Sequence, residues 1–453
     1  MLNKIKNKTL NAVVSILYSI SFIWGYIVWI YPTWDYLGYS YNEIYTNDYS
    51  YLCIIVVICT IPTLWMPTML SRPSMIVYWM LYLMTFIPMI IGVSLSNHFT
   101  TNEIFRFNFF ALLSFFITGV GYHIKLYNFR ASLLNRRIFW NYFSIITLIF
   151  FGYTIFIFRN SLTFVGIFAS NSSDLYEFRF SGRDIEVQYP LVGYAILWLS
   201  GAFFPFILAI GIVNNKKIMI LISIIGQIIL YMTMANKAFI LSIFFMGIVY
   251  YFMKKTKNFG ATLSMFLCFF TFLFTFSQEY FIDDLKLIFF PFTSLFLIRT
   301  IGVSSLTSSL YYDFFKNHPY TYYSHVSIFN KFITYPYKDE MIGVVIGEHY
   351  TSISRYNVNA NMYITDGLVA LGLIGMPIVG VACCIIFYFI DSVSKNHNIL
   401  FTSLLLSYAG LNMMNVSLFT SIISGGLFFT VIFLFFFKPS ENQKNQYENS
   451  NVM

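Results

Sequence analysis

Charged residues are scarce in this chain of 453 residues. Asp, Glu, Lys and Arg together make up only 10% of the sequence, whereas 58% of the residues are hydrophobic. A soluble globular domain carries about 25% charged residues, so the composition excludes that class. Long apolar stretches of this kind are typical of proteins that cross a membrane many times.

Cysteine and the common cofactor motifs are also rare or absent. All five cysteines fall inside apolar runs, which predicts neither a disulfide framework nor a metal site. There is no Gly-rich phosphate loop ending in Gly-Lys-Ser/Thr, no His-Glu-x-x-His and no Gly-x-Ser-x-Gly. We therefore expect no metal and no cofactor. The net charge of +8 is spread over short loops, which disfavours nucleic acid as a partner.

Long apolar runs are what the chain has in abundance. Twelve of them are long enough to cross a bilayer as helices, which takes about 20 residues, and helices are required because lipid leaves no backbone group unpaired. The runs lie near 10–31, 51–71, 75–95, 104–122, 138–158, 190–213, 217–235, 238–253, 260–278, 362–390, 399–417 and 419–437. The predicted fold is an all-α polytopic transmembrane helix bundle over residues 1–437, followed by a disordered cytoplasmic tail over 438–453.

One shorter apolar run departs from this pattern. Residues 287–298 include Pro291 and are too few for a span, so we interpret them as a re-entrant or interfacial element. A thirteenth span is the alternative.

Short basic loops set the expected orientation. With a cytoplasmic N-terminus, clusters such as Lys254, Lys255 and Lys257 all lie inside, in agreement with the positive-inside rule. Two sizeable loops, about 159–189 and 279–361, then lie on the outer face.

Basic residues on the outer face are the candidate anion ligands. A membrane enzyme without cofactors needs an activated substrate, such as a lipid-linked pyrophosphate sugar, whose leaving group calls for fixed cations. Lys237 occupies the tip of a tight hairpin and Arg299 ends the short apolar run. Arg183 and Arg355 are weaker candidates. Snorkelling of Lys237, anchoring by Arg299 and a solvated mixed-charge surface around Arg183 are the alternative interpretations.

The loop over 279–361 is rich in tyrosine and histidine. Nine tyrosines lie between Tyr311 and Tyr356, together with His318, His325 and His349. Tyrosine offers a flat face for sugar rings and a hydroxyl for their polar edges. Since aromatic residues make up 21% of the whole chain, a compositional origin is the alternative. Each histidine taken alone is more often structural than catalytic.

Asparagines and one aspartate open the helix that follows this loop. Asn357, Asn359 and Asn361 alternate, and Asp366 lies five residues further on. Asparagine is a favoured helix N-cap, which is the alternative to a binding function. A carboxylate at membrane depth needs a partner or a function, so Asp366 is a candidate site residue.

The order of these segments resembles the late periplasmic loop of the Wzy-type oligosaccharide repeat-unit polymerases of O-antigen and capsule. The matching segments are Arg299-Thr-Ile-Gly, Tyr311-Tyr-Asp-Phe-Phe, His318-Pro319, Pro336-Tyr337, Ile346-Gly347-Glu348-His349-Tyr350, Asn359-Ala-Asn361, Asp366-Gly367, Gly372 and Gly375. The resemblance implies a metal-independent glycosyltransferase on the periplasmic face of a bacterial inner membrane. Its substrate would be an undecaprenyl-pyrophosphate-linked oligosaccharide repeat unit, and its partners membrane lipids, a chain-length regulator and a flippase.

The resemblance also implies functions for single residues. Lys237 and Arg299, with Arg183 and Arg355 as weaker partners, would bind pyrophosphate. Asp366 would orient or deprotonate the acceptor hydroxyl, with His349 as the second choice. The remaining expected substrate contacts are Asn359, Asn361 and Tyr311.

Other functions stay open at this point. The layout is similar to that of the O-antigen ligases, but these carry a histidine where Ala360 stands. That departure argues against a ligase and leaves the base without an obvious candidate. A lipid-linked oligosaccharide flippase or other transporter, expected to have polar residues deep in several spans, and a non-catalytic assembly partner are the further alternatives.

Overall fold

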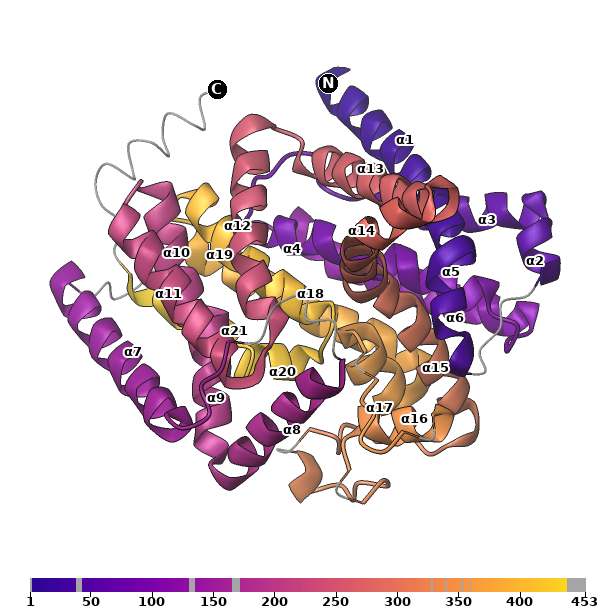
Figure 1. The fold of residues 1–453 in the computed structure, drawn as a ribbon. Coiled ribbons are helices and arrows are strands. Elements are labelled where there is room, and N and C mark those ends of the chain that lie inside the picture. Colours follow the sequence, from indigo (N-terminus) through magenta and orange to yellow (C-terminus); the bar gives the residue numbers. More distant parts are fainter. Residues whose placement is uncertain are drawn as a thin grey trace.

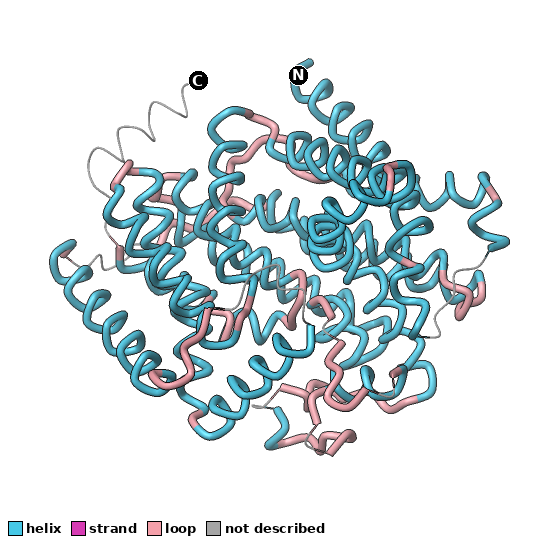
Figure 2. The backbone as a smooth tube through the Cα atoms, in the orientation of Figure 1, coloured by secondary structure: helices cyan, strands magenta, loops and turns pink. Residues whose placement is uncertain are grey.

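The computed structural model describes residues 2–37, 43–129, 135–164, 172–326, 329–338, 340–351, 353–358 and 360–437. Within these ranges every regular element is a helix (Figures 1 and 2), which confirms the all-α class. The expected tail over 438–453 lies outside the described residues.

The α-helices differ widely in length, and several are joined end to end through turns of wider π-helix. They are α1 Leu2–Gly25, α2 Glu43–Asn47, α3 Tyr49–Thr60, α4 Ser74–Leu81, α5 Ile87–Leu95, α6 Thr101–Val120, α7 Arg136–Phe158, α8 Ser172–Gln188, α9 Pro190–Trp198, α10 Phe204–Val213, α11 Lys217–Met234, α12 Lys237–Lys255, α13 Phe259–Tyr280, α14 Asp283–Thr293, α15 Val303–Asn317, α16 Ile342–Tyr350, α17 Val369–Leu371, α18 Gly375–Ser394, α19 Ile399–Met413, α20 Leu418–Ile423 and α21 Leu427–Phe436. The π-helical turns are η1 Tyr26–Ile30, η4 Tyr82–Phe86, η6 Leu199–Phe203, η7 Ser294–Gly302 and η9 Tyr363–Leu368.

Ten helical segments of the described chain are long and apolar enough to cross a bilayer, as in a multi-pass membrane protein. They are Ile5–Trp34, Ser74–Leu95, Thr101–His123, Arg136–Phe158, Pro190–Val213, Lys217–Met234, Lys237–Lys255, Phe259–Tyr280, Asp283–Asn317 and Tyr363–Ser394. Nine of the twelve expected spans are among them.

The other three expected spans form shorter apolar helices, Tyr49–Leu64, Ile399–Met413 and Leu427–Phe436. The run near 419–437 is divided because Gly426 has a positive φ of 84°, which interrupts the helix between α20 and α21. The count of twelve is therefore not confirmed.

Contacts between neighbouring helices show which ends share a face of the bundle. α1 and α13 run parallel, since Asn258 donates to Asn11 at 2.8 Å and, ten residues further along both segments, Ser21 donates to the Cys268 carbonyl at 3.5 Å. Lys8 donates to the Leu64 carbonyl, whereas Tyr51 donates to the Ser94 carbonyl. The end of α5 thus lies at the face opposite the start of α1. We call it the loop face, because the segment from His318 to Tyr356 joins it (Figure 1).

The continuous helix from Asp283 to Asn317 begins and ends at the loop face. It starts directly after α13, which ends at that face, and then turns back so that Phe296 packs on Phe270 and Phe274 of α13. At its other end Lys316 pairs with Glu103 at the start of α6, with Nζ and Oε1 3.2 Å apart. The helix is long and apolar enough to cross a bilayer. The re-entrant interpretation of residues 287–298 therefore stays a prediction, as does the alternative of a thirteenth span.

Residues Tyr363 to Ser394 form a hairpin rather than one straight span. The chain reverses at Gly372, whose φ is +65°. Gly367 in the short arm then lies directly against Gly375 and Met376 in the long arm, α18. This fold places Asp366 inside the protein, next to the interruption between α19 and α20.

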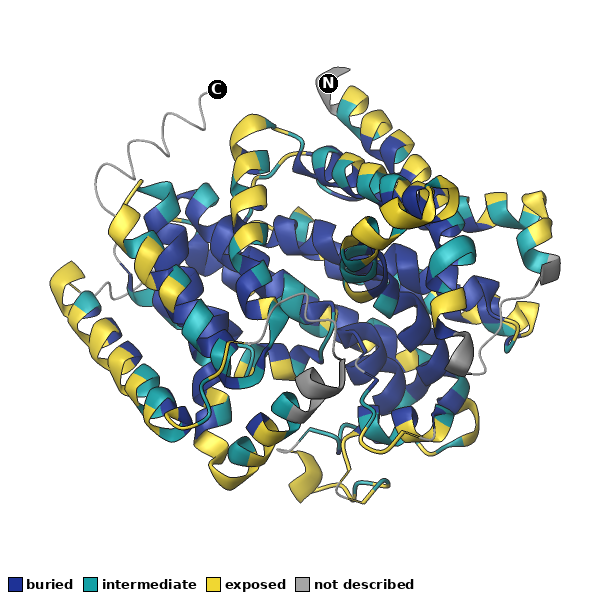
Figure 3. Ribbon diagram, in the orientation of Figure 1, coloured by how far each residue is buried: buried dark blue, intermediate teal, exposed yellow. Residues whose placement is uncertain are grey.

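Burial divides the bundle into a centre and a periphery (Figure 3). The segment Ser74–Leu95 is fully enclosed by its neighbours, whereas α7 is largely exposed along its length. α8 also exposes much of one side, at the loop face.

Candidate functional site

Three basic side chains from different segments lie within electrostatic reach of one another near the hairpin of α11 and α12. Lys237 is the first residue of α12, and the positive charges of Arg179 on α8 and Arg299 on η7 both act on it. Arg179 also donates to the Ala235 carbonyl at 3.2 Å. Like charges repel, so a group of three cations favours binding of an anion between them.

The local sequence explains how α8 approaches this hairpin. Ala235 has a positive φ of 48° and ends α11, while the Asn236 side chain accepts from the backbone N–H of Ala238 and starts α12. Gly182 of α8 packs directly on Met234, because a Cβ there would lie 2.8 Å from the Met234 Cγ. The absent side chain at Gly182 thus brings Arg179 to the hairpin tip.

The two weaker basic candidates lie apart from this group. Arg183 is exposed, and its charge acts on Glu186, whose carboxyl pKa is raised chiefly by burial and lowered in part by Arg183. Arg355 is also exposed, and its backbone N–H donates to Glu348 at 2.8 Å. No contact of the described residues joins either arginine to Lys237.

Asp366 is fully buried in η9. Its Oδ1 accepts from the Ser417 hydroxyl at 2.6 Å, and its Oδ2 accepts from the backbone N–H of Leu418. Both donors belong to the N-terminus of α20, where unpaired N–H groups and the helix dipole favour a negative charge. The carboxylate at membrane depth therefore has the partner that the sequence required but did not identify.

His325 is the second partner of Asp366. Its Nε2 lies 3.6 Å from the Asp366 Oδ1, and its side chain is only 6% exposed. Its Nδ1 lies 2.7 Å from the Thr321 hydroxyl. Burial and the charge of Asp366 raise the pKa of the neighbouring Tyr323.

Backbone hydrogen bonds hold the histidine segment against the hairpin. The N–H groups of Thr321 and Tyr322 donate to the carbonyls of Val369 and Ala370, at 2.9 and 3.0 Å. These carbonyls end a helix and would otherwise be unpaired. Tyr322 and Tyr323 have positive φ values of 49° and 67°, a strained backbone that persists only where surrounding structure imposes it.

The predicted substrate contacts near the helix start have structural partners. Asn361 is buried, and its side chain accepts from the Ile364 N–H at 3.2 Å, at the start of the helical segment that opens at Met362 and leads into η9. Tyr311 is also buried and donates to the Val358 carbonyl at 2.7 Å. Asn359 lies outside the described residues. The capping interpretation of the asparagines thus fits Asn361.

His349 does not lie beside Asp366. It is exposed on α16, and its ring contacts Phe314 and His318, with centroids 5.2 and 5.3 Å away. His318 stacks flat on Phe314 and bonds to the Phe314 carbonyl through Nδ1. Of the three loop histidines, His325 is the one that reaches the buried carboxylate.

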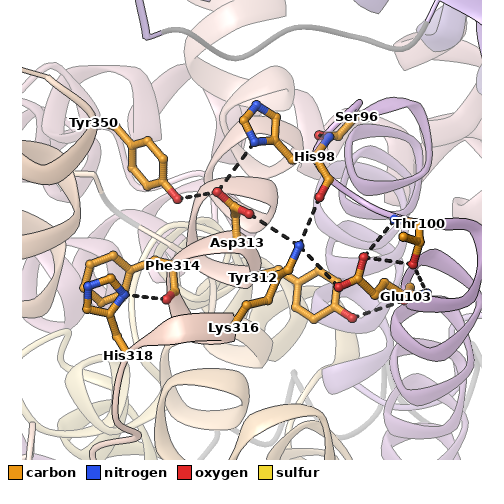
Figure 4. Close-up of polar contacts among 10 residues, drawn as sticks. All are labelled: Ser96, His98, Thr100, Glu103, Tyr312, Asp313, Phe314, Lys316, His318 and Tyr350. Atoms are coloured by element: carbon orange, nitrogen blue, oxygen red, sulfur yellow. Dashed lines mark hydrogen bonds and ion pairs between the residues drawn. The ribbon is translucent and has the colours of Figure 1, made fainter.

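A second polar cluster ties α15 to the turn between α5 and α6 (Figure 4). Lys316 pairs with Glu103 and with Asp313, at 3.2 and 3.7 Å, and donates to the His98 carbonyl. Asp313 also accepts from the Tyr350 hydroxyl at 2.8 Å. These interactions fix the loop segment relative to the bundle.

Several loop tyrosines hydrogen-bond within the protein. Tyr335 donates to the Glu340 carbonyl, and Tyr337 donates to the Pro319 carbonyl at 2.6 Å. Burial raises the pKa of Tyr337 to about 12. Tyr322, by contrast, is 55% exposed, so it retains the free ring face expected of a sugar platform.

The sequence placed Arg179 and Arg183 on either side of Ser181-Gly182 and favoured Arg183 as the pyrophosphate ligand. It did not reveal the pairing of His325 with Asp366, or Ser417. Gly182, which lies one turn from Arg179, offers a partial signal in the sequence, because small residues mark close helix packing in membranes. Ser417 lies far from Asp366 in the sequence, and no local pattern connects them.

No protein-family model, no curated protein and no solved structure matches this chain. The likeness to the Wzy-type polymerases therefore rests on the residues of the chain itself.

Proposed function

We propose that this protein is a bacterial inner-membrane glycosyltransferase that polymerises undecaprenyl-pyrophosphate-linked oligosaccharide repeat units into O-antigen or capsular polysaccharide. The group of Lys237, Arg179 and Arg299 carries the proposal. Three cations from separate segments suit a diphosphate leaving group. In this proposal the N-terminus is cytoplasmic and the loop face is periplasmic.

The proposed reaction is a single glycosyl transfer. An acceptor hydroxyl on one lipid-linked repeat unit forms a bond to the anomeric carbon of the growing glycan. The bond between that carbon and the pyrophosphate oxygen breaks, and lipid pyrophosphate leaves with the electron pair. The three cations stabilise the charge on the leaving oxygen. Asp366 orients or deprotonates the acceptor hydroxyl.

Polymerisation by the purified protein tests the proposal. Lipid-linked repeat units isolated from cells that lack the protein are incubated with it, and product length is resolved on a gel. We expect long products from the wild type. Lys237→Gln, Arg179→Gln and Arg299→Gln should each lower turnover about 100-fold, because oriented charge at a leaving group contributes roughly that factor.

Two further variants complete the test. Lys331→Gln removes an exposed charge of the loop segment and should leave turnover within about twofold. Arg183→Gln, four residues beyond Arg179 on α8, should have a small effect because Arg183 is exposed and near Glu186. Wild-type protein that binds the substrate but never extends it would contradict the proposed function.

A lipid-linked oligosaccharide transporter is the second candidate. Secondary transporters place buried polar groups between interrupted helices near the membrane midplane, and Asp366 lies between the hairpin turning at Gly372 and the start of α20. Loss of a polymerase leaves single repeat units displayed on the cell surface. Loss of a flippase leaves none there.

A further inference from the structure

We propose that Tyr323, Phe329 and Phe419 form the binding surface for a sugar ring of the acceptor repeat unit. We call these three side chains the aromatic triad. The inference rests on the proposed function and adds the site of the acceptor glycan to that of the pyrophosphate. The loop segment and α20, which carry the triad, lie near α8 at the loop face (Figure 1).

The three rings contact one another at nearly equal distances. The centroid of Tyr323 lies 6.2 Å from that of Phe329 and 6.1 Å from that of Phe419, and the last two centroids lie 6.0 Å apart. The ring plane of Phe419 makes angles of 81° and 77° with the other two planes. Because the edge of one ring meets the face of another in such packing, the rings form a corner rather than a flat stack.

Solvent reaches every ring of the triad. Phe329 is 37% exposed, and Tyr323 and Phe419 are partly exposed. A sugar ring that comes from the loop face can therefore contact them. The buried carboxylate of Asp366 has no such access, since its side chain is fully enclosed.

Polar side chains directly follow two of the rings. Asn330 comes after Phe329, and Thr420 comes after Phe419; both are exposed. An amide and a hydroxyl offer donors and acceptors together, and a pyranose has an apolar face of C–H groups with a rim of hydroxyls. Aromatic rings with such neighbours suit a sugar better than a lipid tail, which has no group for the amide or the hydroxyl to bind.

The size of the triad also favours a sugar. Protein interfaces on a monomer are marked by exposed apolar patches of roughly several hundred Å² or more. Three partly covered rings offer a smaller surface, which is comparable to one or two pyranose rings.

The fold holds the triad from two directions. Tyr323 has a positive φ of 67° and follows the segment that is bonded to the hairpin carbonyls. Strained backbone of this kind is concentrated at ligand-binding and catalytic positions. Phe419 lies two residues beyond Ser417, whose hydroxyl donates to Asp366 at 2.6 Å. The bonds of the buried carboxylate thus keep the start of α20, and with it Phe419, in place.

Saturation-transfer NMR tests binding without catalysis. The probe is the free repeat-unit oligosaccharide, released by mild acid from lipid-linked units of cells that lack the protein. With the full-length wild type in detergent, we expect the strongest transfer to the C–H protons on one face of a single sugar. Phe329→Ala and Phe419→Ala should each weaken the affinity about fivefold, because an aromatic contact contributes roughly that factor.

Two further variants show whether the ring itself is required. Phe329→Tyr keeps an aromatic ring and should bind within about twofold of wild type. Phe332→Ala removes an 83% exposed ring of the same segment that lies outside the triad, and should leave the affinity unchanged. Where Phe419→Ala lowers the melting temperature, Phe329→Ala decides, because Phe329 is exposed and its loss is not expected to disturb the core.

The polymerisation assay provides a second readout. Phe329→Ala should raise the KM for the lipid-linked repeat unit about fivefold and leave kcat within about twofold, because stacking holds the sugar equally in the ground state and the transition state. Lys237→Gln is expected to do the opposite, lowering kcat more than it raises KM.

The outcomes separate this inference from the proposed function. A wild type that makes no polymer overturns both. Polymer from the wild type, with unchanged affinity and KM in Phe329→Ala, overturns the triad alone. An active wild type that does not bind the free oligosaccharide at concentrations well above KM does the same. Equal weakening by Phe332→Ala would also overturn it, since binding would then not be specific to the triad.

Discussion

At the residue scale, the buried polar groups of this protein are stabilised by helix ends from distant parts of the sequence. Asp366 accepts from the start of α20, and Asp391 accepts from the Ser74 N–H and hydroxyl at the start of α4. Burying an ionised carboxylate without such donors would cost roughly several kcal/mol of folding free energy, so the group would take up a proton instead. The start of each of these helices thus supplies hydrogen-bond donors to a carboxylate on a distant segment.

His397, between α18 and α19, predicts an acid-sensitive stability. It is buried, donates through Nε2 to the Leu434 carbonyl at 2.7 Å, and burial lowers its pKa from 6.5 to about 4. Between pH 6.5 and about pH 4 the histidine is protonated in the unfolded chain but neutral in the folded protein, so the free energy of unfolding decreases as pH falls. One such histidine lowers the free energy of unfolding by about 2 kcal/mol when the pH falls from 7 to 5.

Thermal unfolding of the detergent-solubilised protein at these two pH values checks this prediction. His397→Gln keeps an N–H donor for the Leu434 carbonyl but cannot titrate. We expect its melting temperature to change less between pH 7 and pH 5 than that of the wild type. An equal change in both proteins would show that other groups dominate.

Local sequence patterns predict some site residues and not others. Lys237 was found because a hairpin without a loop forces its tip to the membrane surface, and Asp366 because a charge inside an apolar run is costly. The pairing of His325 with Asp366 depends on how residues 321 and 322 bond to residues 369 and 370. That register is set by tertiary packing, which one sequence does not reveal.

At the element scale, apolar runs predict where helices form but not where they are interrupted. The run near 362–390 predicted one span, yet the chain reverses at Gly372. Glycine permits this reversal because it adopts a positive φ without strain, but glycine also occurs in unbroken membrane helices. Only the packing of the two arms distinguishes these cases.

The close contact of the two arms leads to a prediction for Gly375. A Cβ at this position would overlap the carbonyl oxygen of Gly367, a backbone atom that cannot move aside alone. Gly375→Ala should therefore push the arms apart and destabilise the protein by about 1–3 kcal/mol. Turnover should fall as well, since Asp366 lies on the displaced arm.

Gly247 on α12 provides the matched control. A Cβ there meets no heavy atom within 4 Å, so Gly247→Ala should leave the melting temperature unchanged or raise it slightly through helix propensity. Equal melting temperatures for Gly375→Ala and Gly247→Ala would argue against tight packing of the hairpin.

At the scale of the whole molecule, the helix from Asp283 to Asn317 decides which side of the membrane carries the site. If its two ends lie at one face, as its contacts with α13 and α6 indicate, then Arg299, His325 and Lys237 all face the same compartment. If it crossed the bilayer instead, the loop segment with His325 would be separated from the basic group. A glycosyl transfer that uses both requires the first arrangement.

Cysteine labelling of intact cells distinguishes these arrangements. Cys53 is the exposed cysteine among the five, so Cys53→Ser gives a background of low reactivity. In this background, Asp284→Cys probes the start of the helix and Phe332→Cys probes the loop segment that follows its end. Lys255→Cys probes the opposite end of the bundle, and all three positions are exposed. With a maleimide that does not cross membranes, we expect both Asp284→Cys and Phe332→Cys to be labelled, and Lys255→Cys only after the cells are opened. Labelling of one but not the other of the first pair would mean that the helix spans, and the site would then have to be divided between the two compartments.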